Sequence, residues 1–378
     1  MSHFSCLVIG PDPEAQLAPF HEFECTGTDN EYVKDVDKTD ELRADYETHT
    51  VSMCRHVKTG ELISRYDDQF YRDPTAEEKK HVGIGSGCGG GLVWSSRDWG
   101  DGRGYRAKVH DVPAGWVEVQ VPIKETQTLA EFAEYQYGHK VLRPGEARGE
   151  HHKYGFAEVD ANGELVRCID RTNPDRQWDW WVVGGRWCGF FPLKEGADGV
   201  AREGAGAAHG LKAEPRTADQ LRKGDVDFDR ARDEAAAKGT ERFTRWENCL
   251  GGAERPSAWS EFHTRAEDET DEYTWDQARE AYRSQPAIDR WNRLPDSGLG
   301  CPVAAFGFDQ ASYVQRCRDG AIVPFAIVKD GKWHEKGSMG WFGCVSDERP
   351  EADWGAEARR LYDDLPDDTL LTLVDCHI

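Results

Sequence analysis

Apolar residues follow a strand pattern at both ends of the chain. Residues 4–9 are apolar with β-branched residues and stop at Gly10-Pro11, which predicts an N-terminal strand. Residues 369–377 are apolar on both faces, which predicts a strand in the middle of a sheet. Asn162-Gly163 and Asp330-Gly331 each separate two strand-like runs, and both dipeptides are preferred in tight hairpins.

Helices are predicted between these strands by caps and by apolar residues three or four positions apart. The apolar face of the helix that starts at Thr39 includes Leu42, Tyr46 and Met53. The other predicted helices start at Pro13, Thr75, Thr128 and Pro350 or span residues 226–246 and 274–283.

This order of elements predicts an α+β fold with a mixed, largely antiparallel sheet and helices packed on it. Residues 1–195 are expected to form the first part of one core, and residues 301–378 are expected to complete it. Residues 196–300 are expected to contain a Gly/Ala-rich loop and a helical insertion. Within that stretch, residues 196–224 are predicted to be a long, mobile connection.

Charge and cysteine content narrow the class of protein. The 378 residues include 70 Asp and Glu against 47 Lys and Arg, a formal net charge of -23. Such a surface repels phosphate backbones and anionic lipid, so neither direct nucleic-acid binding nor membrane binding is expected. The eleven cysteines include no C-x-x-C pair, which argues against a zinc site and a disulfide scaffold. No signal peptide or membrane span is visible, so we expect a cytoplasmic protein.

The densest group of aromatic side chains lies in residues 178–187, with the sequence WDWWVVGGRW. On a strand, Trp178, Trp180 and Val182 share one face, opposite Asp179, Trp181 and Val183. One tryptophan face is expected in the core. The turn at Gly184 and Gly185 is expected to place Arg186 and Trp187 at the rim of a pocket for a phosphate or carboxylate. The alternative for Arg186 is a buried cation–π contact.

Two glycine-rich segments could contribute to the same pocket. In residues 83–91, the backbone N–H groups of Gly85 and Gly87 could bind an anion. This segment lacks a P-loop signature, so a flexible loop is the simpler interpretation. Turn chemistry explains the Asp and Gly residues of segment 98–105, but not Arg103 and Tyr105, which we include as candidate ligand-binding residues.

Asp375 and His377 share a face of the last predicted strand, so a histidine oriented by a carboxylate is possible and both are candidate catalytic residues. Cys376 faces the other way and cannot pair with His377. The alternative is that His377 has a structural role: it caps the end of the strand and its hydrogen bonds are made within the protein. A further segment, residues 21–25, contains His, Glu and Cys, but in an extended backbone these side chains diverge. We therefore predict a solvated acidic turn and no metal ligands.

The chain resembles a family of uncharacterised proteins of tailed bacteriophages and prophages, and the likeness covers nearly its whole length. The segments that carry it are MSHF and LVIG in residues 1–10, QLAPFHEFECTG (16–27), DWGDGRGY (98–105), WDWWVVGGRW (178–187), KGDVDFD (223–229) and DDTLLTLVDCHI (367–378). The resemblance implies a cytoplasmic accessory protein that is made in the host during infection and is not part of the virion. It implies no activity and no catalytic residues.

Three functions follow as hypotheses. The first is binding of a small anionic, nucleotide-like ligand, directed against host defence signalling. The second is a hydrolase or transferase that uses Asp375 and His377 with Arg186. The third is an acidic protein that binds and inhibits a DNA-binding host factor. The sequence does not decide whether the chain is an enzyme. It also does not identify a cofactor, a host partner or the oligomeric state.

Overall fold

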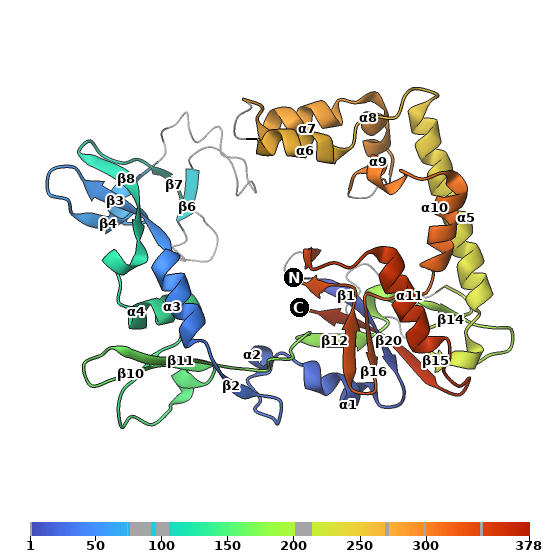
Figure 1. Ribbon diagram of the computed structural model, residues 1–378, viewed down its shortest axis with the longest axis horizontal. Helices are drawn as coiled ribbons and strands as arrows, with labels where there is room; N and C mark the ends of the chain where they lie inside the picture. Colours follow the sequence, from blue (N-terminus) through green and yellow to red (C-terminus); the bar gives the residue numbers. More distant parts are fainter. Residues whose placement is uncertain are drawn as a thin grey trace. The chain divides into compact units, whose positions relative to one another are not determined.

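The computed structural model describes residues 2–73, 75, 92–95, 106–200, 214–268, 272–295, 297, 300–340 and 343–378 (Figure 1). They form an α+β fold with largely antiparallel sheets, as the order of elements predicts. The chain folds into two compact units. Unit 1 consists of Met1–Cys25 and Asp175–Ile378, and unit 2 consists of Thr26–Pro174.

A mixed sheet forms the centre of unit 1, with both chain termini next to it (Figure 1). In spatial order its strands are β12 (Trp180–Val183), β20 (Leu370–His377), β1 (His3–Ile9), β16 (Ala326–Lys329) and β17 (Lys332–Glu335), and β15 (Gln220–Arg222) also pairs with β20. Only β1 and β16 run parallel among these pairs. The predicted hairpin at Asp330-Gly331 is confirmed by β16 and β17. The interior position of β20 is also confirmed, because β1 and β12 lie on either side of it.

Each face of this sheet is covered by its own set of apolar side chains. One set joins Leu7 and Leu373 of the sheet to Trp354 of α11 (Glu351–Tyr362). The other joins Cys6 and Cys376 to Leu17 of α1 (Pro13–Leu17). Both helices begin where the sequence predicts them. Burial on both faces explains why β20 has no polar face along most of its length.

Residues 196–300, where a helical insertion is expected, contain four helices of unit 1 among the described residues: α5 (Phe228–Leu250), α6 (Trp259–Glu267), α7 (Trp275–Arg283) and α8 (Pro286–Asn292). The helices continue past residue 300 as α9 (Pro302–Ala305) and α10 (Gln310–Asp319), in the part that was expected to complete the core. Trp246, Trp291 and Phe306 centre a separate apolar cluster there. None of the helices in the described residues combines the length and apolarity that crossing a bilayer requires.

The prediction of a long connection over residues 196–224 is wrong for the part that the structure describes. Thr217–Ala218 forms β14, which pairs with β13 (Phe191–Pro192), and β15 extends the main sheet. Ala218 and Leu221 are buried. A Cβ at Gly199 would lie 2.6 Å from Cβ of Ala218, so glycine allows close packing there, which composition alone cannot distinguish from a flexible loop.

The described residues of unit 2 form three small sheets and the α-helices α3 and α4. The first sheet has the strand order β2 (Lys34–Asp37), β11 (Leu165–Thr172), β10 (Gly155–Val159) and β9 (Val141–Leu142). The second has the order β4 (Leu62–Ser64), β3 (Thr50–His56) and β8 (Trp116–Pro122). The third has the order β5 (Tyr71–Arg72), β7 (Arg106–His110) and β6 (Leu92–Ser95). The hairpin at Asn162-Gly163 is confirmed. Helix α3 (Thr39–Thr48) starts as predicted but ends before Met53, which lies in β3. Helix α4 (Leu129–Tyr137) has the predicted cap at Thr128. The helix predicted at Thr75 falls largely outside the described residues.

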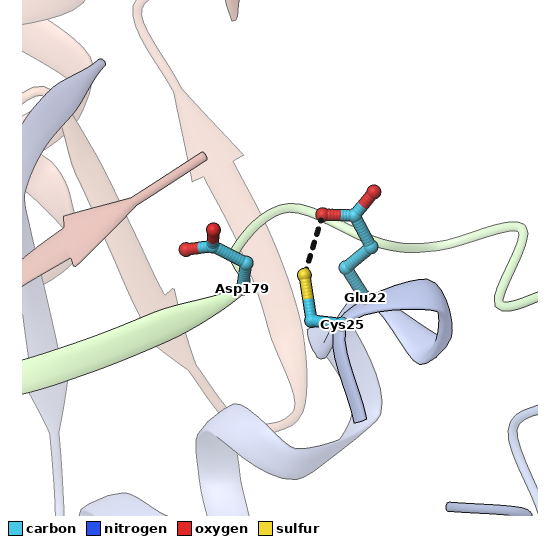
Figure 2. Close-up of side chains that lie close together, drawn as sticks. All are labelled: Glu22, Cys25 and Asp179. Carbon is cyan, nitrogen blue, oxygen red and sulfur yellow. Dashed lines mark hydrogen bonds between the residues drawn. The ribbon is translucent and has the colours of Figure 1, made fainter. Parts of the chain in front are cut away.

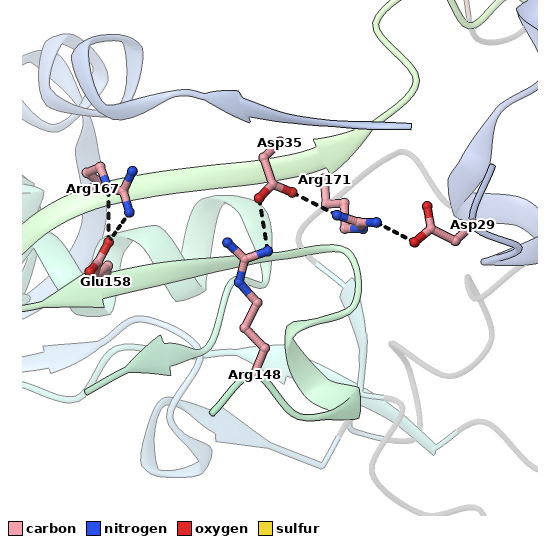
Figure 3. A network of polar contacts seen from close by, with 6 residues as sticks. All are labelled: Asp29, Asp35, Arg148, Glu158, Arg167 and Arg171. Atoms are coloured by element: carbon pink, nitrogen blue, oxygen red, sulfur yellow. Dashed lines mark hydrogen bonds and ion pairs between the residues drawn. The ribbon is translucent and has the colours of Figure 1, made fainter. Parts of the chain in front are cut away.

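An ion-pair network ties β2 to β11 in unit 2 (Figure 3). Arg171 bonds to Asp29 and, at 3.0 Å, to Asp35, while Arg148 lies 2.9 Å from the other oxygen of Asp35. Burial raises the pKa of Asp35, but hydrogen bonds from Arg148 and Arg171 outweigh it and hold that pKa below its usual value.

The division into units differs from the single core expected from residues 1–195 and 301–378. Residues 26–174 bury their own cluster, which includes Leu42, Phe132 and Cys168. Periodicity marks the buried face of each element, but it does not show which elements bury their faces together.

Candidate functional site: a two-histidine centre

Three aromatic rings form a compact cluster on one face of the main sheet of unit 1. In the strand register, His377 of β20 is opposite both His3 of β1 and Trp180 of β12. Directly opposite residues in antiparallel strands place their side chains on the same face. The ring centroids are accordingly 4.8 Å apart for His3 and His377, 5.1 Å for Trp180 and His377, and 5.2 Å for His3 and Trp180.

Each of the two imidazoles contacts its own carboxylate through Nδ1. His3 Nδ1 lies 2.9 Å from Asp375 Oδ1, and His377 Nδ1 lies 2.6 Å from Asp179 Oδ1 and 2.8 Å from Oδ2. An ionised carboxylate only accepts hydrogen bonds, so each Nδ1 carries a proton. In both rings Nε2 is therefore the nitrogen that can exchange a proton with a ligand.

Asp375 is held in turn by the backbone of the glycine turn. Its second carboxylate oxygen accepts the N–H of Arg186 at 3.0 Å. Gly185 has φ +52, and a Cβ there would lie 2.3 Å from Cβ of Asp375. Glycine is therefore required at position 185 for close approach of the turn to Asp375.

The two-histidine centre is buried at its base and exposed at one end. The His377 side chain is 6% exposed and that of Asp375 is 3% exposed, whereas Trp180 is 40% exposed. Among the predicted site residues, Trp180 therefore offers an aromatic surface to solvent beside both histidines.

A second polar cluster adjoins Asp179 (Figure 2). The thiol of Cys25 donates a hydrogen bond of 3.4 Å to Glu22 Oε2, and the ligand atoms of Glu22, Cys25 and Asp179 all lie within 4.8 Å of one another. Burial and the neighbouring charges of Glu22 and Asp179 raise the pKa of the Cys25 thiol to about 12. The backbone of residues 21–25 turns, as predicted: α2 (Phe23–Thr26) supplies the bend that brings Glu22 and Cys25 together.

The structure places the predicted ligand-binding residues in different environments. Trp180 belongs to the centre, and Gly184 and Gly185 are buried beneath it. Arg186 contributes its backbone N–H, while its side chain is exposed. Trp187 packs against the cluster of Phe191 and Leu373. The remaining predicted residues, Gly85, Gly87, Arg103 and Tyr105, lie outside the described residues.

The predicted alternation of residues 178–183 is wrong at its start. Trp178 is buried with Val183, and its Nε1 donates to the carbonyl of Leu17 at 3.1 Å. Asp179 instead reaches His377 on the face of Trp180. The reason is that the regular strand begins only at Trp180, after an isolated bridge between His21 and Trp178.

Asp375 and His377 both lie in the centre, but the hydrogen bonds join them to different partners. Asp179 orients His377, and Asp375 orients His3. Sequence reasoning missed His3 and Asp179 as site residues. The sequence did hold one signal for His3: the first strand begins and the last strand ends with a histidine. That signal points to a shared site only when the two strands pair, and they are more than 350 positions apart. Cys376 lies in the apolar cluster on the opposite face from His377, and burial raises its pKa well above the usual value.

A search of protein-family models, of curated proteins and of solved structures finds no match to this chain.

Proposed function

We propose that this protein is a hydrolase or transferase that acts on a small anionic, nucleotide-like substrate at the two-histidine centre. The observation that supports this proposal is the pair His3 and His377, side by side, each held at Nδ1 by a separate aspartate. A carboxylate in this position fixes the orientation of an imidazole and stabilises the imidazolium that forms when Nε2 takes up a proton.

Hydrolysis and group transfer both need a base to activate the attacking group and an acid to protonate the leaving group. Each ring has Nδ1 turned toward its own aspartate, so Nε2 of His3 and Nε2 of His377 are the nitrogens left for these two roles. His3 and His377 can then act together as base and acid.

The substrate class rests on the surroundings of the two rings. Trp180 stacks on His377 and keeps an exposed surface on which a flat base can stack. Arg186, whose side chain is exposed, is anchored to Asp375 by its backbone and offers donors for a phosphate. A net charge of -23 favours a small anion over a nucleic-acid polymer.

The test is turnover of cyclic dinucleotides, NAD and ADP-ribose derivatives by the purified chain, with products separated by chromatography. We expect turnover of at least one class and a loss of about 100- to 10,000-fold in His3→Asn and in His377→Asn. His263→Asn is the matched control, because His263 also contacts a carboxylate, Glu267, but lies on α6. Its activity should stay unchanged.

Two results would contradict the proposal. One is turnover that survives in the double variant His3→Asn/His377→Asn. The other is no turnover of any compound by folded protein, with or without a thermal shift that indicates binding.

A further inference from the structure

Glu22, Cys25 and Asp179 bring three possible metal-ligating atoms, two carboxylate oxygens and one sulfur, within 4.8 Å of one another (Figure 2). Glu22 and Cys25 come from the turn that contains α2, whereas Asp179 comes from the segment directly before β12. In the described part of the chain, no lysine or arginine forms an ion pair with these two carboxylates. Among the described residues, the imidazole of His377 is the basic group that contacts Asp179, and two carboxylates this close together attract a further cation.

A separate observation at Glu24 also favours a cation near this cluster. Glu24 Oε2 is buried and has no hydrogen-bond partner among the described residues. Its negative charge acts on the Cys25 thiol, so Glu24 lies within electrostatic range of the cluster. A buried carboxylate oxygen without a partner is rare in folded proteins, and an ion is a common explanation.

Asp179 also has the support that metal ligands usually have. Both of its carboxylate oxygens lie within hydrogen-bond distance of Nδ1 of His377, whose side chain is only 6% exposed. Outer partners of this kind fix the orientation of a ligating group and strengthen metal binding.

We propose that Glu22, Cys25 and Asp179 bind one thiophilic divalent ion of the zinc class. One thiolate and two carboxylates are donors that zinc accepts, and three protein ligands leave a position open for water or substrate. A thiolate ligand disfavours magnesium and calcium, which prefer oxygen.

Binding requires the thiol to lose its proton. The S–H bond breaks, the proton passes to solvent, and the sulfur lone pair forms the bond to the metal without any change of oxidation state. The hydrogen bond from Cys25 to Glu22 is then replaced by bonds from both residues to the ion. The inference does not depend on the proposed catalytic function, because it is tested by binding.

The experiment titrates the reduced, chelator-treated full chain with Co²⁺ and with Zn²⁺. We expect one tight ion per chain by elemental analysis, release of protons in calorimetry, and a thiolate-to-cobalt charge-transfer absorption band. Cys25→Ser should remove the band and weaken Zn²⁺ binding by more than about 100-fold, and His377→Asn should weaken it by about 10- to 100-fold. Cys344→Ser is the control, because Cys344 is also an exposed free cysteine.

Circular dichroism of each variant reports whether the fold survives. The inference is overturned if the wild-type chain binds neither ion, or if folded Cys25→Ser keeps both the stoichiometry and the absorption band. It is also overturned if Cys344→Ser loses the band while Cys25→Ser retains it.

Discussion

At the scale of single residues, the two-histidine centre depends on close contacts that few side chains allow. Asp375 accepts a hydrogen bond from His3 and another from the Arg186 backbone, so both of its oxygens are used. A buried carboxylate without such partners would be strongly destabilising. The glycine turn therefore supports the centre from beneath, whatever ligand the exposed side takes.

Gly185→Ala is predicted to destabilise unit 1 by about 3 kcal/mol or more. The added methyl group would overlap Asp375 in addition to the strain of a positive φ. Gly331→Ala is the control, because Gly331 also has positive φ (+70) but no atom lies within 4 Å of its Cβ position. It should cost only about 1–2 kcal/mol in urea denaturation. Equal costs for the two variants would show that Gly185 does not need the space.

At the scale of elements, local signals identify helix starts and hairpins well. Thr128 and Glu131 bond to each other's backbone N–H, which completes the capping box at the start of α4. Asn162-Gly163 and Asp330-Gly331 join adjacent strands. These features involve residues only a few positions apart, so their geometry is encoded locally.

Thr128→Ala is predicted to lower the free energy of unfolding of unit 2 by about 1 kcal/mol, because the cap of α4 loses its side-chain acceptor. Thr48→Ala serves as the comparison. Thr48 is exposed, lies at the end of α3 and makes only long hydrogen bonds of 3.3 Å to preceding carbonyls. Its replacement should change stability by less than about 0.5 kcal/mol. If both variants are equally stable in urea denaturation, the capping box does not stabilise the unit.

At the scale of the whole molecule, the chain divides its apolar residues between two units. The N-terminal and C-terminal strands pair in unit 1, and a continuous segment from residue 26 to residue 174 forms unit 2. Each unit buries an apolar cluster of its own, and separate cores give separate unfolding transitions. We therefore expect two thermal transitions in calorimetry of the full chain.

Asp35→Asn is predicted to lower only the transition of unit 2, and by an amount that depends on pH. The lowered pKa of Asp35 means that the folded state holds the carboxylate charged, so its contribution to stability is complete above the usual aspartate pKa. It is lost as pH falls through the lower, folded-state pKa. The difference in Tm between wild type and variant should thus be largest above about pH 5 and shrink toward about pH 3. A difference that does not vary with pH would contradict this account.

Sequence alone determined the local elements and the fold class of this protein, because caps, hairpin dipeptides and periodicity act over a few residues. It also identified Trp180, Asp375 and His377, which later proved to lie in one centre. The tertiary structure decided the rest. His3 joins His377 only because the first and last strands pair, and Asp179 reaches His377 only because the backbone before Trp180 is irregular. Both arrangements depend on contacts between residues that are far apart in the chain. Local sequence patterns carry no information about such contacts.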